Sequence, residues 1–238
     1  MVLVLLPVRA VLADPRVRID LERETHKKVV VAVTDFVLDD SIADFMGIGN
    51  EAKKILEKDL VLSEWFTLLQ KPVFEDLERM ELSRQGVDYR SWRQLGAQWL
   101  IKTEYSVMRN GKGQAFTFRL YDAVNKRFLL GKRYRASRDL FRKTLHRFAD
   151  EVVMQLTGLR GNSETQIAFL NQEGAGKEIY LIDFDGYNLR RLTHDNTLNL
   201  SPAWSPDGKW IIYTSYAAGN PDLIMIDSVG EKRQTLHR

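Results

Sequence analysis

A repeat with a period of 44 residues in the last third of the chain constrains the fold more than any other feature. The segment 167–192 recurs at 211–236 without insertion or deletion, and Asp183, for example, matches Asp227. A period of this length is that of a four-stranded blade of a β-propeller. Arrays of this kind usually bind partners through their loops, so the repeat favours a binding protein over an enzyme.

The second repeat carries enough turn chemistry to place its four strands. Residues 205–208 (SPDG) form a tight turn, because Pro206 fixes its φ angle and Gly208 tolerates the fourth turn position. The equivalent positions of the first repeat, 161–164, are a polar linker, so 165–238 holds about one and a half blades of an incomplete propeller. We therefore expect the chain to be part of a longer protein. The predicted strands of the second repeat are Pro202–Ser205, Trp210–Ser215, Leu223–Asp227 and Lys232–Leu236.

The residues before the repeat alternate between strand and helix patterns. The predicted strands are Val29–Phe36, Trp65–Leu69, Trp99–Val107, Ala115–Ala123 and Phe128–Ala136, and the predicted helices are Ile42–Leu62, pieces within Val73–Leu95 after a break at Pro72, and Arg138–Leu156. This order predicts an α/β domain with a small mixed sheet over 14–157, followed by a linker at 158–164.

The first 13 residues are mostly apolar, and Val11-Leu12-Ala13 puts small side chains where a signal peptidase cleaves. We interpret 1–13 as the remnant of a signal peptide, which predicts a periplasmic mature chain that begins near Asp14. The run is too short to span a membrane, so we expect a protein that is at most peripheral to one. A buried N-terminal strand is the alternative. The absence of cysteine fits either compartment.

Positive charge is concentrated in one segment, although the net charge of the chain is only +3. Residues 126–147 hold nine Lys or Arg and a single acid, Asp139. This run is either a solvated strand and helix face or a surface for an anionic partner, such as a lipid surface or an acidic protein face. No base-stacking or groove-binding motif accompanies it, so no nucleic-acid partner is expected.

Motifs of catalysis and cofactor binding are missing from the sequence. Residues 47–52 fit the G-x-G-x-x-A pattern of a dinucleotide-binding turn, but four acids nearby oppose a pyrophosphate. No G-x-S-x-G, H-E-x-x-H or Walker motif occurs. We therefore predict no enzyme activity and no cofactor.

No group of metal ligands stands out either. The four histidines are scattered: His26, His146, His194 and His237. A lone histidine is more often a surface or capping residue than a ligand. Asp183 and Asp185 resemble a calcium pair, but a turn between two strands explains them equally well, and the repeat has Val229 in place of Asp185. The sequence thus predicts no metal site.

Three segments, Tyr180–Asn188, Arg190–Thr193 and Asn199–Lys209, resemble the TolB family of periplasmic propeller proteins. The order of signal remnant, α/β domain and blades is similar as well. The resemblance implies a non-enzymatic scaffold of the Tol-Pal system, with a six-bladed propeller. Such a scaffold links the inner-membrane Tol proteins to the lipoprotein Pal while the envelope constricts at cell division.

Two groups of partner-binding residues follow from this resemblance. Val17, Arg18, Ile19 and Asp20 occupy the place of the family's N-terminal arm, which reaches TolA. Pal is bound by loops at one face of the propeller, and the candidates in this chain are His194, Asn199, Leu200 and Ser201. A strand docked permanently on its own domain is the alternative for the arm. The alternative for the whole chain is the front part of a propeller-capped serine peptidase, which predicts a G-x-S-x-G further along the gene.

Overall fold

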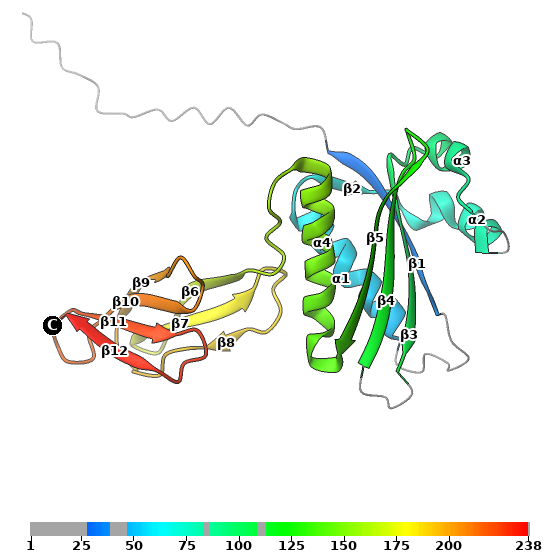
Figure 1. The fold of residues 1–238 in the computed structure, drawn as a ribbon. Helices are drawn as coiled ribbons and strands as arrows, with labels where there is room; N and C mark the ends of the chain where they lie inside the picture. Colours follow the sequence, from blue (N-terminus) through cyan, green and yellow to red (C-terminus); the bar gives the residue numbers. More distant parts are fainter. Residues whose placement is uncertain (1–27, 39–46, 83–85, 109–112, 238) are drawn as a thin grey trace, which may run out of the picture.

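The computed structural model describes residues 28–38, 47–82, 86–108 and 113–237 (Figure 1). The predicted signal remnant and the arm residues Val17–Asp20 lie outside these ranges.

The N-terminal region is built on one mixed five-stranded sheet in the order β2-β1-β3-β4-β5. Its strands are β1 (Val29–Leu38), β2 (Phe66–Leu68), β3 (Trp99–Val107), β4 (Gly113–Asp122) and β5 (Arg127–Ser137). β1 runs parallel to β2 and β3, whereas β3, β4 and β5 form an antiparallel meander. The predicted mixed sheet is confirmed.

Helices cover both faces of this sheet, and each face has its own core. The helices are α1 (Ile48–Leu62), α2 (Lys71–Leu82), α3 (Tyr89–Gln94), a short 3-10 helix η1 (Arg138–Leu140) and α4 (Phe141–Thr157). On the side of α1 and α4, Phe118 of β4 stacks on Phe148 of α4 with the ring centroids 4.1 Å apart. On the side of α2 and α3, Phe74 packs on Trp92 at 5.3 Å. The sheet is therefore buried in the middle of three layers.

Pro72 and the glycines of the G-x-G-x-x-A segment have structural roles that differ from those their sequence patterns suggest. Pro72 does not break the chain, because it is the second residue of α2, where the missing N–H needs no partner. The glycines of the G-x-G-x-x-A segment serve the backbone and its packing. Gly47 has a φ of 66° before α1, and a Cβ at Gly49 would lie 2.8 Å from the Tyr105 ring.

The C-terminal region consists of two antiparallel sheets that follow the 44-residue repeat. The first has three strands, β6 (Gln166–Glu173), β7 (Gly176–Asp183) and β8 (Arg190–Arg191), and the second has four, β9 (Asn199–Trp204), β10 (Trp210–Ser215), β11 (Asp222–Asp227) and β12 (Arg233–His237). The starts of β6 and β10, and the ends of β7 and β11, are each 44 residues apart. A shared apolar core joins the two sheets: Ile179, Leu181, Leu192, Ile211, Tyr213, Ile224 and Ile226. The fold is that of an incomplete β-propeller.

Within the described ranges, no helix combines the length and the apolar character that a membrane crossing requires.

Candidate functional site

The turn between β7 and β8 packs against α4, so the first propeller sheet meets the α/β region there (Figure 1). Asp185 of this turn is buried and forms an ion pair with the Arg142 guanidinium. The same guanidinium lies 3.8 Å from the centre of the Tyr187 ring. Stacking of this kind adds a cation–π attraction to the ion pair. The turn is thus fixed to the helix by charge and by an aromatic contact.

The segment between α4 and β6 is tied to the same helix. The Asp150 carboxylate accepts hydrogen bonds from the backbone N–H of Ser163 at 2.8 Å and of Glu164 at 3.3 Å. Gly161 packs so closely on Asp150 that an added Cβ would lie 2.2 Å from the carboxylate. The segment between α4 and β6 therefore runs back along α4 and packs against it.

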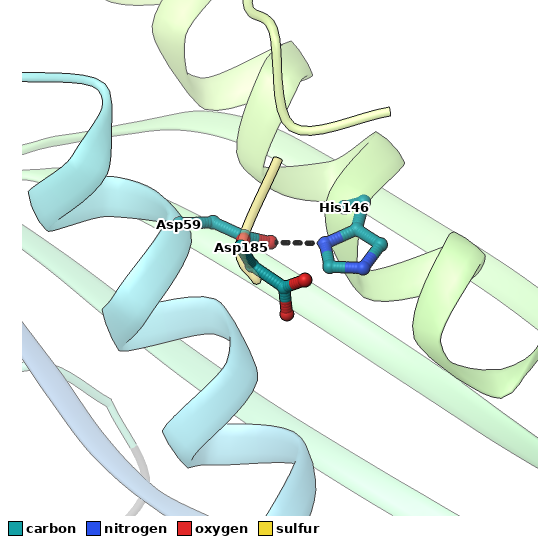
Figure 2. Close-up of side chains that lie close together, drawn as sticks. All are labelled: Asp59, His146 and Asp185. Atoms are coloured by element: carbon teal, nitrogen blue, oxygen red, sulfur yellow. Dashed lines mark hydrogen bonds and ion pairs between the residues drawn. The ribbon is translucent and has the colours of Figure 1, made fainter. Parts of the chain in front are cut away.

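A buried cluster of two carboxylates and an imidazole lies beside this contact. Asp59 of α1 and His146 of α4 approach to 2.6 Å between Oδ2 and Nδ1, and Asp185 completes the cluster (Figure 2). Burial raises the pKa of the Asp59 carboxyl, the hydrogen bond from His146 opposes this, and the charges of Asp185 and Asp150 add to the rise. His146 is therefore neither a surface nor a capping residue, and Asp185 does more than close a turn.

A cleft of about 760 Å³ opens next to the cluster, between α4 and the two propeller sheets. Its helical wall carries Arg138, Arg142, Lys143 and His146, and its opposite wall includes Asn188 and Trp204. Asp139, Glu164 and Asp183 line the same cleft, so charges of both signs face it and suit a polar segment. Part of the basic run seen in the sequence therefore lines a cleft.

The predicted propeller loop is organised by one buried carboxylate, that of Glu178. Glu178 accepts hydrogen bonds from Thr193 Oγ1 at 2.5 Å and from the backbone N–H of Asn196 at 2.7 Å, and it pairs with Arg191 at 2.9 Å. The Asn199 amide also points inward and donates to the Lys177 carbonyl at 3.0 Å. This network fixes the path of the chain from 193 to 199.

Of the four predicted residues only His194 lies in the loop, because Asn199, Leu200 and Ser201 begin β9, and the four differ in accessibility. His194 and Ser201 are exposed, Leu200 is half-buried and Asn199 is fully buried. Ser201 has a φ of 52°, in the left-handed region. Asn199 thus shapes the loop from inside, whereas His194 and Ser201 are free to face a partner. Partner binding by this loop stays a prediction, as does the role of Val17, Arg18, Ile19 and Asp20, which lie outside the described residues.

Sequence reasoning missed the cluster at the junction, although a local pattern pointed to two of its members. Asp59 lies one turn from Ile55 and beside Leu60 on the buried face of α1, and His146 lies on the buried face of α4 with Ala149. A titratable residue at helical spacing within an apolar stripe is expected to be buried and paired. The partner cannot be read from the pattern, because Asp59 and His146 are 87 positions apart.

Two family profiles match the chain side by side. The profile of the TolB amino-terminal domain matches residues 17–129, and that of the TolB beta propeller domain matches 153–237. The chain belongs to the TolB family.

Curated TolB relatives align with most of this chain. The Tol-Pal system protein TolB of Desulfosudis oleivorans is 39% identical over 183 residues, which is 76% of this chain and 41% of the relative. The protein of the same name from Syntrophus aciditrophicus is 31% identical over 220 residues, which is 90% of this chain and 48% of the relative. The chain thus spans less than half the length of these TolB proteins.

The crystal structure of TolB from Acinetobacter baumannii has the same fold. The two structures superpose with a TM-score of 0.71 over 89% of this chain and 50% of the other, at 22% sequence identity. The α/β region followed by propeller strands is therefore the arrangement of a solved TolB.

Proposed function

We propose that this protein is a non-enzymatic periplasmic scaffold of the Tol-Pal system, which links inner-membrane Tol proteins to Pal during envelope constriction at cell division. The observation that carries the proposal is the adjacency of a TolB amino-terminal domain and TolB propeller repeats in one chain. The relatives that align with most of this chain are named as Tol-Pal system proteins. A propeller is suited to this role, because its loops can hold a partner while the attached domain engages another.

Two parts of the chain are proposed to bind different partners. Val17–Asp20 is an apolar and charged segment that can add a strand to the sheet edge of TolA. His194 lies in the loop that Glu178 organises and Ser201 lies near the start of β9, and the exposure of both supports contact with Pal. We propose that residues 158–164 separate the α/β region, which carries the arm, from the propeller region. Asp150 of α4 binds the end of this segment at Ser163.

The experiment measures binding of protein from the whole reading frame, without signal peptide, to the periplasmic parts of Pal and TolA. Replacing Val17–Asp20 by four alanines is expected to abolish binding to TolA and to leave Pal binding unchanged. The pair His194→Ala and Ser201→Ala is expected to weaken Pal binding alone. Arg79→Ala, at an exposed position of α2, is the matched control. Absence of binding to both partners would contradict the proposal.

The peptidase alternative makes a different prediction for the same reading frame. It requires a G-x-S-x-G with Asp and His beyond the propeller repeats. The match of 17–129 to the TolB amino-terminal domain supports the scaffold instead.

A further inference from the structure

We propose that Asp59, His146 and Asp185 form a binding site for a divalent transition-metal ion, with Zn²⁺ as the best match, at the junction of the α/β region and the first propeller sheet. The three side chains come from α1, α4 and the turn after β7, and they point toward one another (Figure 2). One ligand atom from each lies within 4.8 Å of the other two. All three residues are buried.

Hydrogen bonds among the described residues leave part of this donor set unused. Asp59 Oδ1 and His146 Nε2 are buried and have no hydrogen-bond partner there. The two side chains are 0% and 7% exposed. A buried polar atom without a partner costs about 1–3 kcal/mol, so native structures rarely keep one without a reason. A metal ion held by the cluster is such a reason for Asp59 Oδ1, whereas His146 would reach the ion through Nδ1 with Nε2 turned away from it.

The third ligand is held in place by its own partners. Asp185 pairs with Arg142 through Oδ2 and accepts the backbone N–H of Tyr187 at 3.1 Å through Oδ1. A carboxylate has about four lone-pair sites, so both oxygens can still coordinate. Outer partners of this kind fix the orientation of metal-binding carboxylates. Arg142 therefore acts as an outer support of the site.

The net charge of the cluster also favours a cation. Two carboxylates and one guanidinium leave one negative charge when the imidazole is neutral, in a place with little water to screen it. Charges buried in this way are usually paired or bind metal ions.

The donor set selects the kind of metal. An imidazole nitrogen with two carboxylate oxygens suits Zn²⁺, whereas Ca²⁺ and Mg²⁺ prefer oxygen donors alone. In a tetrahedral Zn²⁺ site with bonds of about 2.0 Å, ligand atoms lie about 3.3 Å apart. Asp59 and His146, now 2.6 Å apart, would separate by about 0.7 Å to admit the ion. His146 lines the adjacent cleft of about 760 Å³, which provides an entry path.

The role assigned to the ion is structural. It would join two helices of the α/β region to the propeller at one point, and so hold the two regions in one orientation. The loss of His146 or of either carboxylate should loosen that attachment without affecting the sheets themselves.

Isothermal titration of the untagged, metal-free protein with Zn²⁺ tests the site. We expect one ion per chain and a rise in Tm on addition of Zn²⁺. Asp59→Asn and His146→Gln should each weaken binding about 10–100-fold or more. His237→Gln, which removes an exposed histidine of β12 outside the cluster, should bind as the parent does.

Absorption of the Co²⁺-loaded protein gives a second readout, because the bands of the folded parent report the coordination of the ion directly. A four-coordinate site predicts intense visible bands in the parent chain, which His146→Gln removes. Two results would overturn the proposal. One is the absence of saturable Zn²⁺ binding to the folded parent, and the other is saturable binding that His146→Gln leaves unchanged.

Discussion

The turn after β7 and the turn after β11 occupy equivalent positions in the repeat but contact different surroundings. Both contain a glycine with positive φ, Gly186 at 84° and Gly230 at 91°, and in both the aspartate at the end of the preceding strand accepts hydrogen bonds. Asp183 accepts from the Gln166 side chain, and Asp227 accepts from backbone N–H groups of its own turn. These shared residues form the turn itself.

The position two residues beyond these aspartates separates the turns. Asp185 is 3% exposed and pairs with Arg142 of α4, whereas Val229 is 66% exposed. The aromatic ring of Tyr187, which stacks on Arg142, is likewise replaced by Glu231. Residues common to both repeats therefore build the blade, and residues that break the repeat attach the first sheet to the α/β region.

The largest expected effect comes from giving the first turn the residue of the second. Asp185→Val leaves the half-buried Arg142 guanidinium without its ion-pair partner, which should lower the free energy of unfolding by about 3 kcal/mol, the low end for a buried pair because Arg142 is 20% exposed. The reciprocal change Val229→Asp, at an exposed position, should alter it by less than about 0.5 kcal/mol. Urea denaturation followed by circular dichroism measures both. Equal losses in the two variants would show that Asp185 has no special role.

A smaller effect is expected where the repeats differ in the partners of a buried carboxylate, Glu178 in the first and Asp222 in the second. Glu178 pairs with Arg191 and accepts from Thr193, but the second repeat has Thr235 and His237 at those two positions. Glu178→Gln should therefore lower the free energy of unfolding by about 1–3 kcal/mol and speed amide exchange over 193–199. Asp222→Asn, the equivalent change in the second repeat, should cost less than about 1 kcal/mol. Amide exchange over 193–199 that is as slow in the Glu178→Gln variant as in the parent would contradict the role given to this carboxylate.

The smallest effect concerns the turn after β11 alone. Hydrogen bonds from the backbone N–H groups of Lys232, Glu231 and Gly230 hold the pKa of Asp227 below its ordinary value of 3.8. A lowered folded-state pKa means that the stabilisation is complete above the unfolded-state pKa and is lost as pH falls through the folded-state value. The NMR shift of the Lys232 amide should therefore titrate with a midpoint below 3.8, and Asp227→Asn should remove the titration. A midpoint at or above 3.8 would rule this turn geometry out.

The strands of the propeller region were largely predictable, because the repeat shows which positions of the two segments are equivalent. The predicted Trp210–Ser215 is β10 as observed, and Leu223–Asp227 differs from β11 by one residue. The first predicted strand, Pro202–Ser205, starts three residues after the observed β9. β9 begins at Asn199 and contains Ser201 with positive φ and a shift in pairing register, an irregularity that alternation cannot reveal.

The junction was not predictable from local patterns. Turn chemistry alone explains the Asp-Phe-Asp-Gly segment, so nothing local showed that Asp185 meets Arg142, 43 positions away. The Glu178 network was hidden for the same reason, since its partners follow 13 to 21 positions later in a segment without periodicity. Burial of charge depends on which surfaces the tertiary fold brings together.

The central claim is that side chains of the turn after β7 hold the propeller sheets against α4, in addition to the connecting segment. A distance measured between the α/β region and the propeller region tests this claim most directly. The chain has no cysteine, so spin labels at Val73→Cys on α2 and Leu223→Cys on β11, both exposed positions, report one distance without background. We predict a single narrow distance distribution by pulsed electron paramagnetic resonance, which broadens when Asp185→Val is added. A distribution that stays equally narrow in that variant would contradict this attachment.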